Sequence, residues 1–90
     1  MTRAERIEAA LTEAFGPELL EIVDESHLHA GHAGARPEGE THFRVTLAAA
    51  AFDGVGRVAR QRMVNAALAP EFDRGLHALS IRALAPDEAR

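Results

Sequence analysis

Histidine is the residue type with the clearest chemical potential in this chain of 90 residues, because four of its five histidines lie in ESHLHAGHAGARPEGETHF, residues 25–43. Imidazole nitrogen is a good ligand for iron and zinc. The chain has no cysteine, so a metal bound here needs histidine, carboxylate or ligands from another molecule. The stretch is either part of a metal site or a polar hairpin loop in which histidine replaces other polar residues.

His27, His29 and His32 are close enough in HLHAGH to raise the question of a zinc site that the chain forms alone. A glycine-rich loop loses entropy when it is ordered, and closely spaced imidazoles leave little room for the hydrogen bonds that support metal ligands. We therefore do not expect a self-contained zinc site. His29 and His32 lie beyond the preceding strand, in the glycine-containing part of the loop, and both remain candidates for a shared site.

The fifth histidine, His77, stands at the start of the predicted strand LHALSIRAL. Alternation places it on the side of Leu79 and Ile81, which is expected to face the helices, but the first position of a strand can reach the rim of the sheet. His77 is therefore either a metal ligand or a half-buried histidine that is held by a hydrogen bond. His42 is expected on the outward side of its strand, where its expected role is a hydrogen bond that fixes the hairpin.

A cluster of arginines, Arg57, Arg60 and Arg62, lies around the first half of the predicted second helix. Such side chains suit phosphates, glutathione carboxylates or an acidic partner surface. The alternative is a solvated face whose arginines pair with Asp53 or Glu71.

Neither a reacting centre nor a phosphate clamp is predicted. Gly31 and Gly34 fit the GxxG pattern of KH domains that bind nucleic acid, but they fall between two strands and not between two helices. Ser26 and Ser80 have no paired base nearby in sequence, and there is no cysteine nucleophile. The chain is not expected to be an enzyme.

Charge and length narrow the class further. The formal net charge is −4 and the chain has no lysine, a balance that disfavours a general electrostatic grip on nucleic acid but leaves room for a local basic patch. No apolar run approaches the roughly 18 residues that a membrane span needs, and MTRAERIEAAL does not resemble a targeting signal. We expect a single domain over residues 1–90, located in the cytoplasm and away from membranes.

Apolar spacing divides the chain into elements. Ile7, Leu11 and Phe15 repeat at helical intervals between Thr2 and Gly16, which predicts the first helix. Two strands are expected, LLEIVDES from Leu19 and THFRVTL from Thr41. The alanine run of residues 48–51 is interpreted as the inner end of the second strand.

The second helix is expected in VGRVARQRMVNAAL, followed by a turn or single helical turn in PEFDRG and then by the third strand. Its two faces are expected to carry Ala59, Met63, Ala66 and Ala67 on the buried side, and Arg57, Arg60, Gln61 and Asn65 broadly opposite.

The order is therefore α-β-β-α-β. The first two strands suit an antiparallel hairpin, and the third, returning after a helix, suits a parallel right-handed crossover to the second. We predict an α+β fold with a three-stranded mixed sheet and both helices on one face.

These residues resemble the BolA family. DES, a glycine-proline loop with histidine, ETHF, F-x-G, R-x-R-M-V and LHALSIRALAP occur in order over nearly the whole chain. Gln61 departs from this pattern at a position where histidine is frequent. The resemblance implies a fold related to the type II KH domain and a non-enzymatic partner of monothiol glutaredoxins in iron homeostasis, which shares or exchanges a 2Fe-2S cluster.

The resemblance also implies site residues. His77 matches the family's carboxy-terminal cluster ligand and His29 the loop ligand, although counting back from ETHF allows His32. The cluster is expected to be shared with glutaredoxin and glutathione in a heterodimer, whereas the isolated monomer is expected to bind none. Some members are described as transcriptional regulators that bind DNA, and this alternative would use Arg57, Arg60 and Arg62.

Overall fold

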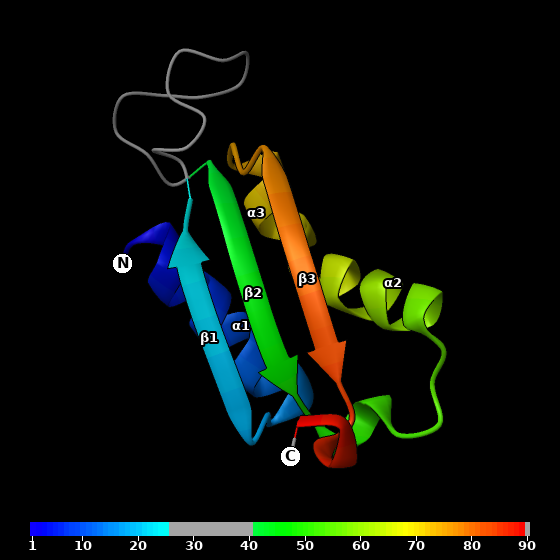
Figure 1. Cartoon of the computed structure of the whole chain (residues 1–90). Helices are drawn as coiled ribbons and strands as arrows, with labels where there is room; N and C mark the ends of the chain where they lie inside the picture. Colours follow the sequence, from blue (N-terminus) through cyan, green and yellow to red (C-terminus); the bar gives the residue numbers. More distant parts are fainter. Residues whose placement is uncertain (26–40, 90) are drawn as a thin grey trace.

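The computed structural model describes residues 1–25 and 41–89 (Figure 1). The predicted order α-β-β-α-β is confirmed, with a further short helix before the last strand. The elements are α1 Arg3–Phe15, β1 Leu19–Asp24, β2 His42–Ala48, the 3-10 helix η2 Ala50–Phe52, α2 Arg57–Ala67, α3 Ala69–Asp73, β3 Ala78–Leu84 and the 3-10 helix η3 Pro86–Ala89.

Local sequence signals fix both ends of α1. The Thr2 side chain accepts a hydrogen bond from the Glu5 N–H, and the Glu5 carboxylate accepts one from the Thr2 N–H, which forms a capping box. Gly16 ends the helix with a φ of 51°, a left-handed conformation that costs glycine little. Ile7 and Leu11 are fully buried on the face toward the sheet.

The sheet has the predicted topology. β2 lies at its centre, antiparallel to β1 and parallel to β3. Ile22, Val45 and Ile81 pair across the three strands, so one row of β-branched side chains faces the core. Figure 1 shows α1 and α3 behind the sheet and α2 alongside β3. Ser26, at the end of the segment predicted as the first strand, lies outside the described residues.

The alanine run leaves the second strand earlier than expected. β2 ends at Ala48, the N–H of Ala49 donates to the Leu84 carbonyl at 3.0 Å, and the chain then turns into η2. Phe52 is fully buried at the end of this turn, and its ring centroid lies 5.0 Å from that of Phe15. Burial of an aromatic ring outweighs further pairing of small alanines, because alanine adds little apolar area.

The buried face of α2 agrees with the prediction only in part, because Met63 and Ala67 pack against the core as expected. Ala59 and Ala66 are exposed, whereas Arg60 and Val64 are buried and Leu68 continues the same stripe at a spacing of four residues. Valine and leucine bury more apolar area than alanine. They therefore turn the helix toward the core and bring Arg60 into the interior.

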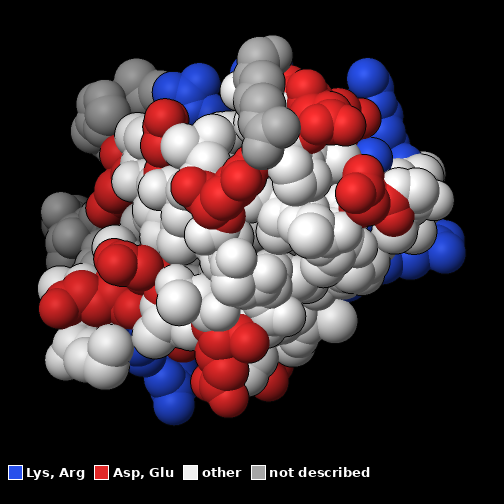
Figure 2. Space-filling model, turned by 90° about the horizontal axis from the view of Figure 1, so that it is seen from below, with Lys and Arg blue, Asp and Glu red and all other residues white. Residues whose placement is uncertain are grey.

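Side chains from the sheet and the helices share one principal core. Its buried members are Ile7, Leu11, Phe43, Val45, Leu47, Ala49, Phe52, Val64, Leu68 and Leu76. Within residues 1–25 and 41–89, every helix is too short or too polar to cross a membrane. Figure 2 shows carboxylates spread over the face seen from below, with arginines near its rim.

Candidate functional site

His77 lies at the end of the turn between α3 and β3, one residue before the strand and not within it. Its N–H donates to the Thr41 carbonyl at 2.8 Å, and the N–H of Ala78 donates to the same carbonyl at 3.1 Å. Gly75, with a φ of 115°, allows the chain to turn here. The His77 side chain is exposed, so the structure presents an accessible imidazole on an anchored backbone.

His42, the first residue of β2, lies beside His77. The two ring centroids are 5.1 Å apart, with an angle of 53° between the ring planes. His42 Nδ1 is 2.9 Å from Thr41 Oγ1. The register pairs His42 with Ala78 on the sheet face away from the helices, as alternation predicts, yet the residue is only 6% exposed. Contact with this held ring limits the orientations of the His77 imidazole.

Glu71 supports the turn that carries His77. Its carbonyl accepts the N–H of Leu76 at 2.9 Å. Its carboxylate, on a residue that is 5% exposed, accepts hydrogen bonds from Arg6 Nε at 3.0 Å and forms ion pairs at 3.4 Å with Arg3 and Arg74. One buried acid therefore fastens α1 to α3. The sequence offered Glu71 as a partner for the arginines of α2, and the structure gives it these others.

Among the described residues, His77 is the one exposed histidine, since His42 is buried. His29, its alternative His32, and His27 all lie outside them. Within residues 1–25 and 41–89, no three histidine or carboxylate side chains gather in a way that could hold a metal ion. The single exposed imidazole of His77 fits one ligand position, whereas iron-sulfur clusters need four protein ligands. Any cluster held at His77 must therefore take its other ligands from outside the described residues, from another molecule, or from both.

The arginine cluster is not the uniform exposed face that was predicted. Arg60 is 9% exposed, and its Nε donates to the Val55 carbonyl at 2.7 Å. Its Nη1 donates to the Ala83 carbonyl at 3.0 Å, and its guanidinium pairs with Glu88. The partner of Arg60 is therefore Glu88 and neither Asp53 nor Glu71. With most of its donors occupied and its side chain largely buried, Arg60 has little left to offer a phosphate.

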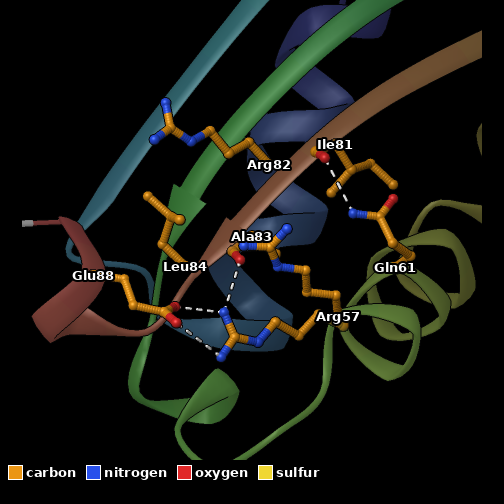
Figure 3. Close-up of a pocket in the computed structure, with 8 residues that line it drawn as sticks. Arg57, Gln61, Ile81, Arg82, Ala83, Leu84 and Glu88 are labelled. Atoms are coloured by element: carbon orange, nitrogen blue, oxygen red, sulfur yellow. Dashed lines mark hydrogen bonds and ion pairs between the residues drawn. The ribbon is translucent and has the colours of Figure 1, made fainter.

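Arg57 and Arg62 are exposed, but the structure separates their surroundings. Arg57 lines a cavity of about 450 Å³ between α2 and β3, and Arg62 does not. Figure 3 shows this cavity, with Gln61 on α2 facing Ile81 on β3 and the Glu88 carboxylate at one end. Sequence reasoning missed Glu88, because the contact joins residues 28 positions apart.

The fold and the exposed histidine at the end of the sheet define a small α+β protein of the BolA type. A family model described as BolA-like protein matches residues 11–88. The chain belongs to the BolA family.

Relatives agree with this assignment over their matched parts. The chain is 51% identical over 89 residues to an uncharacterized protein in the cobS 5′ region of Sinorhizobium sp., covering 98% of this chain and 96% of that protein. It is 44% identical over 89 residues to the chloroplastic protein BOLA1 of Arabidopsis thaliana, covering 97% of this chain. The match spans only 56% of BOLA1, so the chain corresponds to little more than half of that relative.

Solved structures show the same architecture. BolA1 from Arabidopsis thaliana superposes with a TM-score of 0.88 at 38% identity, covering 100% of this chain and 99% of that one. The BolA domain of SufE1 from the same organism gives a TM-score of 0.87 at 41% identity, covering 98% of this chain and 96% of that one.

Proposed function

We propose that this protein is a non-enzymatic adaptor that binds a monothiol glutaredoxin and shares or transfers a 2Fe-2S cluster through histidine ligands, in iron-sulfur trafficking or iron homeostasis. The observation that carries the proposal is the exposed His77 imidazole on a backbone held by Thr41. Membership of the BolA family and the absence of cysteine support it.

The chain's own contribution is to place imidazole nitrogens where a partner presents thiolates. The backbone that carries His77 is held by two hydrogen bonds to the Thr41 carbonyl, from the N–H groups of His77 and Ala78, which lowers the ordering cost of binding. His29 is the proposed second ligand, with His32 as its substitute. The glutaredoxin and glutathione supply the thiolates, and histidine in place of thiolate on one iron raises the reduction potential of a 2Fe-2S centre.

The test is anaerobic reconstitution with a monothiol glutaredoxin and glutathione, followed by visible absorption and by the mass of the complex. The isolated protein is expected to stay colourless, and the mixture is expected to form a cluster-bridged heterodimer. His77→Ala is expected to abolish the bridged spectrum without unfolding the protein, because the side chain is exposed. His27→Ala is the matched control and is expected to retain it.

The loop ligands form the second arm of this experiment. His29→Ala is expected to leave a labile cluster that His32 partly rescues, and the double change His29→Ala with His32→Ala is expected to be clearly worse than either alone. A normal cluster spectrum in His77→Ala would show that this histidine is structural. No complex at all under reducing, anaerobic conditions would contradict the adaptor itself.

A further inference from the structure

The two edge strands of the described sheet, β1 and β3, differ in whether their outward-facing backbone groups have partners. On β3, carbonyl groups accept hydrogen bonds from side chains of α2. Gln61 Nε2 donates to the Ile81 carbonyl at 3.1 Å, and Arg60 Nη1 donates to the Ala83 carbonyl at 3.0 Å. Both carbonyls belong to β3, whose only strand neighbour among the described residues is β2. Side chains of α2 therefore satisfy acceptors that a further strand would need, which is one way that proteins protect a sheet edge.

The edge of β1 is open in its middle. The N–H of Glu25 donates to the His42 carbonyl, and the antiparallel register then makes Glu21 and Val23 the β1 residues that exchange hydrogen bonds with β2. The backbone groups of Leu20 and Ile22 consequently point away from β2. β1 is the first strand of the sheet, so these groups face a position that no described strand occupies.

A groove of about 380 Å³ runs along this edge between α1 and β1. Ala4, Glu8 and Thr12, spaced by four residues, form its helical wall, and the half-buried side chains of Leu20 and Ile22 form its apolar side. A helix beside an unpaired strand is the geometry that accepts an extended peptide. In such sites the backbone supplies affinity and the alternate side chains supply specificity.

The charge around the groove indicates what kind of segment it suits. Glu8 is exposed on the wall and none of the residues that line the groove is basic. Acidic side chains recur on β1 itself, at Glu21 and Asp24. A second copy would bring two acidic β1 strands together, and like charges on neighbouring strands are destabilising. The groove therefore suits a basic strand from another protein better than it suits self-association.

We propose that the groove between α1 and β1 binds an extended, arginine- or lysine-containing segment of a partner protein, which adds to β1 as a fourth strand. Its backbone bonds to Leu20 and Ile22, and a basic side chain faces Glu8. Because β1 and β3 are opposite edges of the sheet (Figure 1), a segment bound here leaves His77 uncovered. This docking site is independent of the cluster function.

The probe is a synthetic hexapeptide of alternating valine and arginine, acetylated and amidated at its ends, titrated into the ¹⁵N-labelled full chain. The amide signals of Leu20 and Ile22 are expected to shift most, and their hydrogen exchange is expected to slow. Glu8→Lys is expected to weaken the affinity by about three- to tenfold, as expected for a reversed surface charge. Glu13→Lys, on an exposed position of the same helix outside the groove, is the matched control and is expected to bind normally.

Three outcomes would overturn the proposal. The first is equal binding by a peptide in which glutamate replaces arginine, and the second is equal binding by one with a central proline, which cannot pair as a strand. The third is a concentration-dependent dimer in sedimentation whose contacts map to β1, because the occupant would then be a second copy. Each is read without glutaredoxin, so failure here is separate from failure of the cluster experiment.

Discussion

At the scale of single residues, the Glu71 carboxylate decides how the end of the molecule that carries His77 is held. Three guanidinium groups, from Arg3, Arg6 and Arg74, surround this one buried acid. Breaking a buried ion pair by removing one partner leaves uncompensated charge, which costs more than the pair contributes as a whole. Among these four charged residues, Glu71 is thus the one whose loss costs most, because all three ion pairs depend on it.

We expect Glu71→Gln to lower the free energy of unfolding by about 2–3 kcal/mol, because it leaves three arginines without their carboxylate while they remain partly able to reach water. Urea unfolding measures this change. Glu13→Gln, an exposed glutamate on α1, is the control and is expected to stay within about 0.5 kcal/mol of the parent protein. An effect of Glu71→Gln as small as that of the control would show that the three arginines find other partners.

At the scale of residues, the sequence indicated that His77 lies near the rim of the sheet but did not indicate the burial of Arg60. The role of His77 as a ligand stays a prediction. The start of the strand is predicted to within about one residue, and this places the His77 backbone. Alternation predicted the side of Leu79 and Ile81, whereas the exposed ring lies beside His42 because His77 precedes the strand. The burial of Arg60 depends on Val55, Ala83 and Glu88, which are 5, 23 and 28 residues away. Arginine is almost never fully buried unless it is paired. Because the partners of Arg60 are distant in sequence, no local pattern predicts its burial.

At the scale of elements, the Arg60–Glu88 pair joins α2 to η3 across the end of β3. Glu88 also accepts the N–H of Ala85. The hydrogen bond from Arg60, followed by that from Ala85, lowers the pKa of the Glu88 carboxyl below its ordinary value of 4.5. Folding therefore favours the ionised form of the Glu88 carboxyl.

A pH dependence follows from this lowered pKa. The contribution of Glu88 to stability is fully present above the unfolded-state pKa and is lost as pH falls through the lower folded-state pKa. Glu88→Gln is expected to unfold at lower urea concentration near neutral pH. As the pH falls below the ordinary carboxyl pKa of 4.5, it is expected to lose less stability than the parent protein. Urea midpoints across this range measure it. Parallel pH profiles for the two proteins would mean that the pair contributes nothing to folding.

The sequence predicted which helices and strands form, but it predicted only in part which side of α2 faces the core and did not predict where the chain turns after β2. The caps of α1 and the alternation of β2 are local signals, and both helix and strand lie where they were expected. The rotation of α2 and the turn at η2 depend on where Val64 and Phe52 find space in a core made by distant segments. In alanine-rich segments the apolar pattern says least about which face is buried, because small side chains fit either face.

At the scale of the whole molecule, charge bears on the DNA-binding alternative. The formal net charge is −4, and Arg60 is committed to Glu88. Arg57 and Arg62 alone remain from the predicted basic face. Long-range repulsion between an acidic protein and DNA opposes the few contacts that two arginines can make.

We therefore expect weak DNA binding, with log affinity falling against log salt with a slope of about −2, since each neutralised phosphate contributes roughly −0.9. Fluorescence anisotropy on a labelled duplex over a salt series measures the slope. Charge reversal at Arg57 and Arg62 is expected to remove the remaining binding, and Arg44→Glu, an exposed arginine on the sheet, serves as the control for net charge. Tight, sequence-selective binding that survives His77→Ala but is lost on reversal at α2 would make regulation of DNA, and not cluster sharing, the better account of this protein.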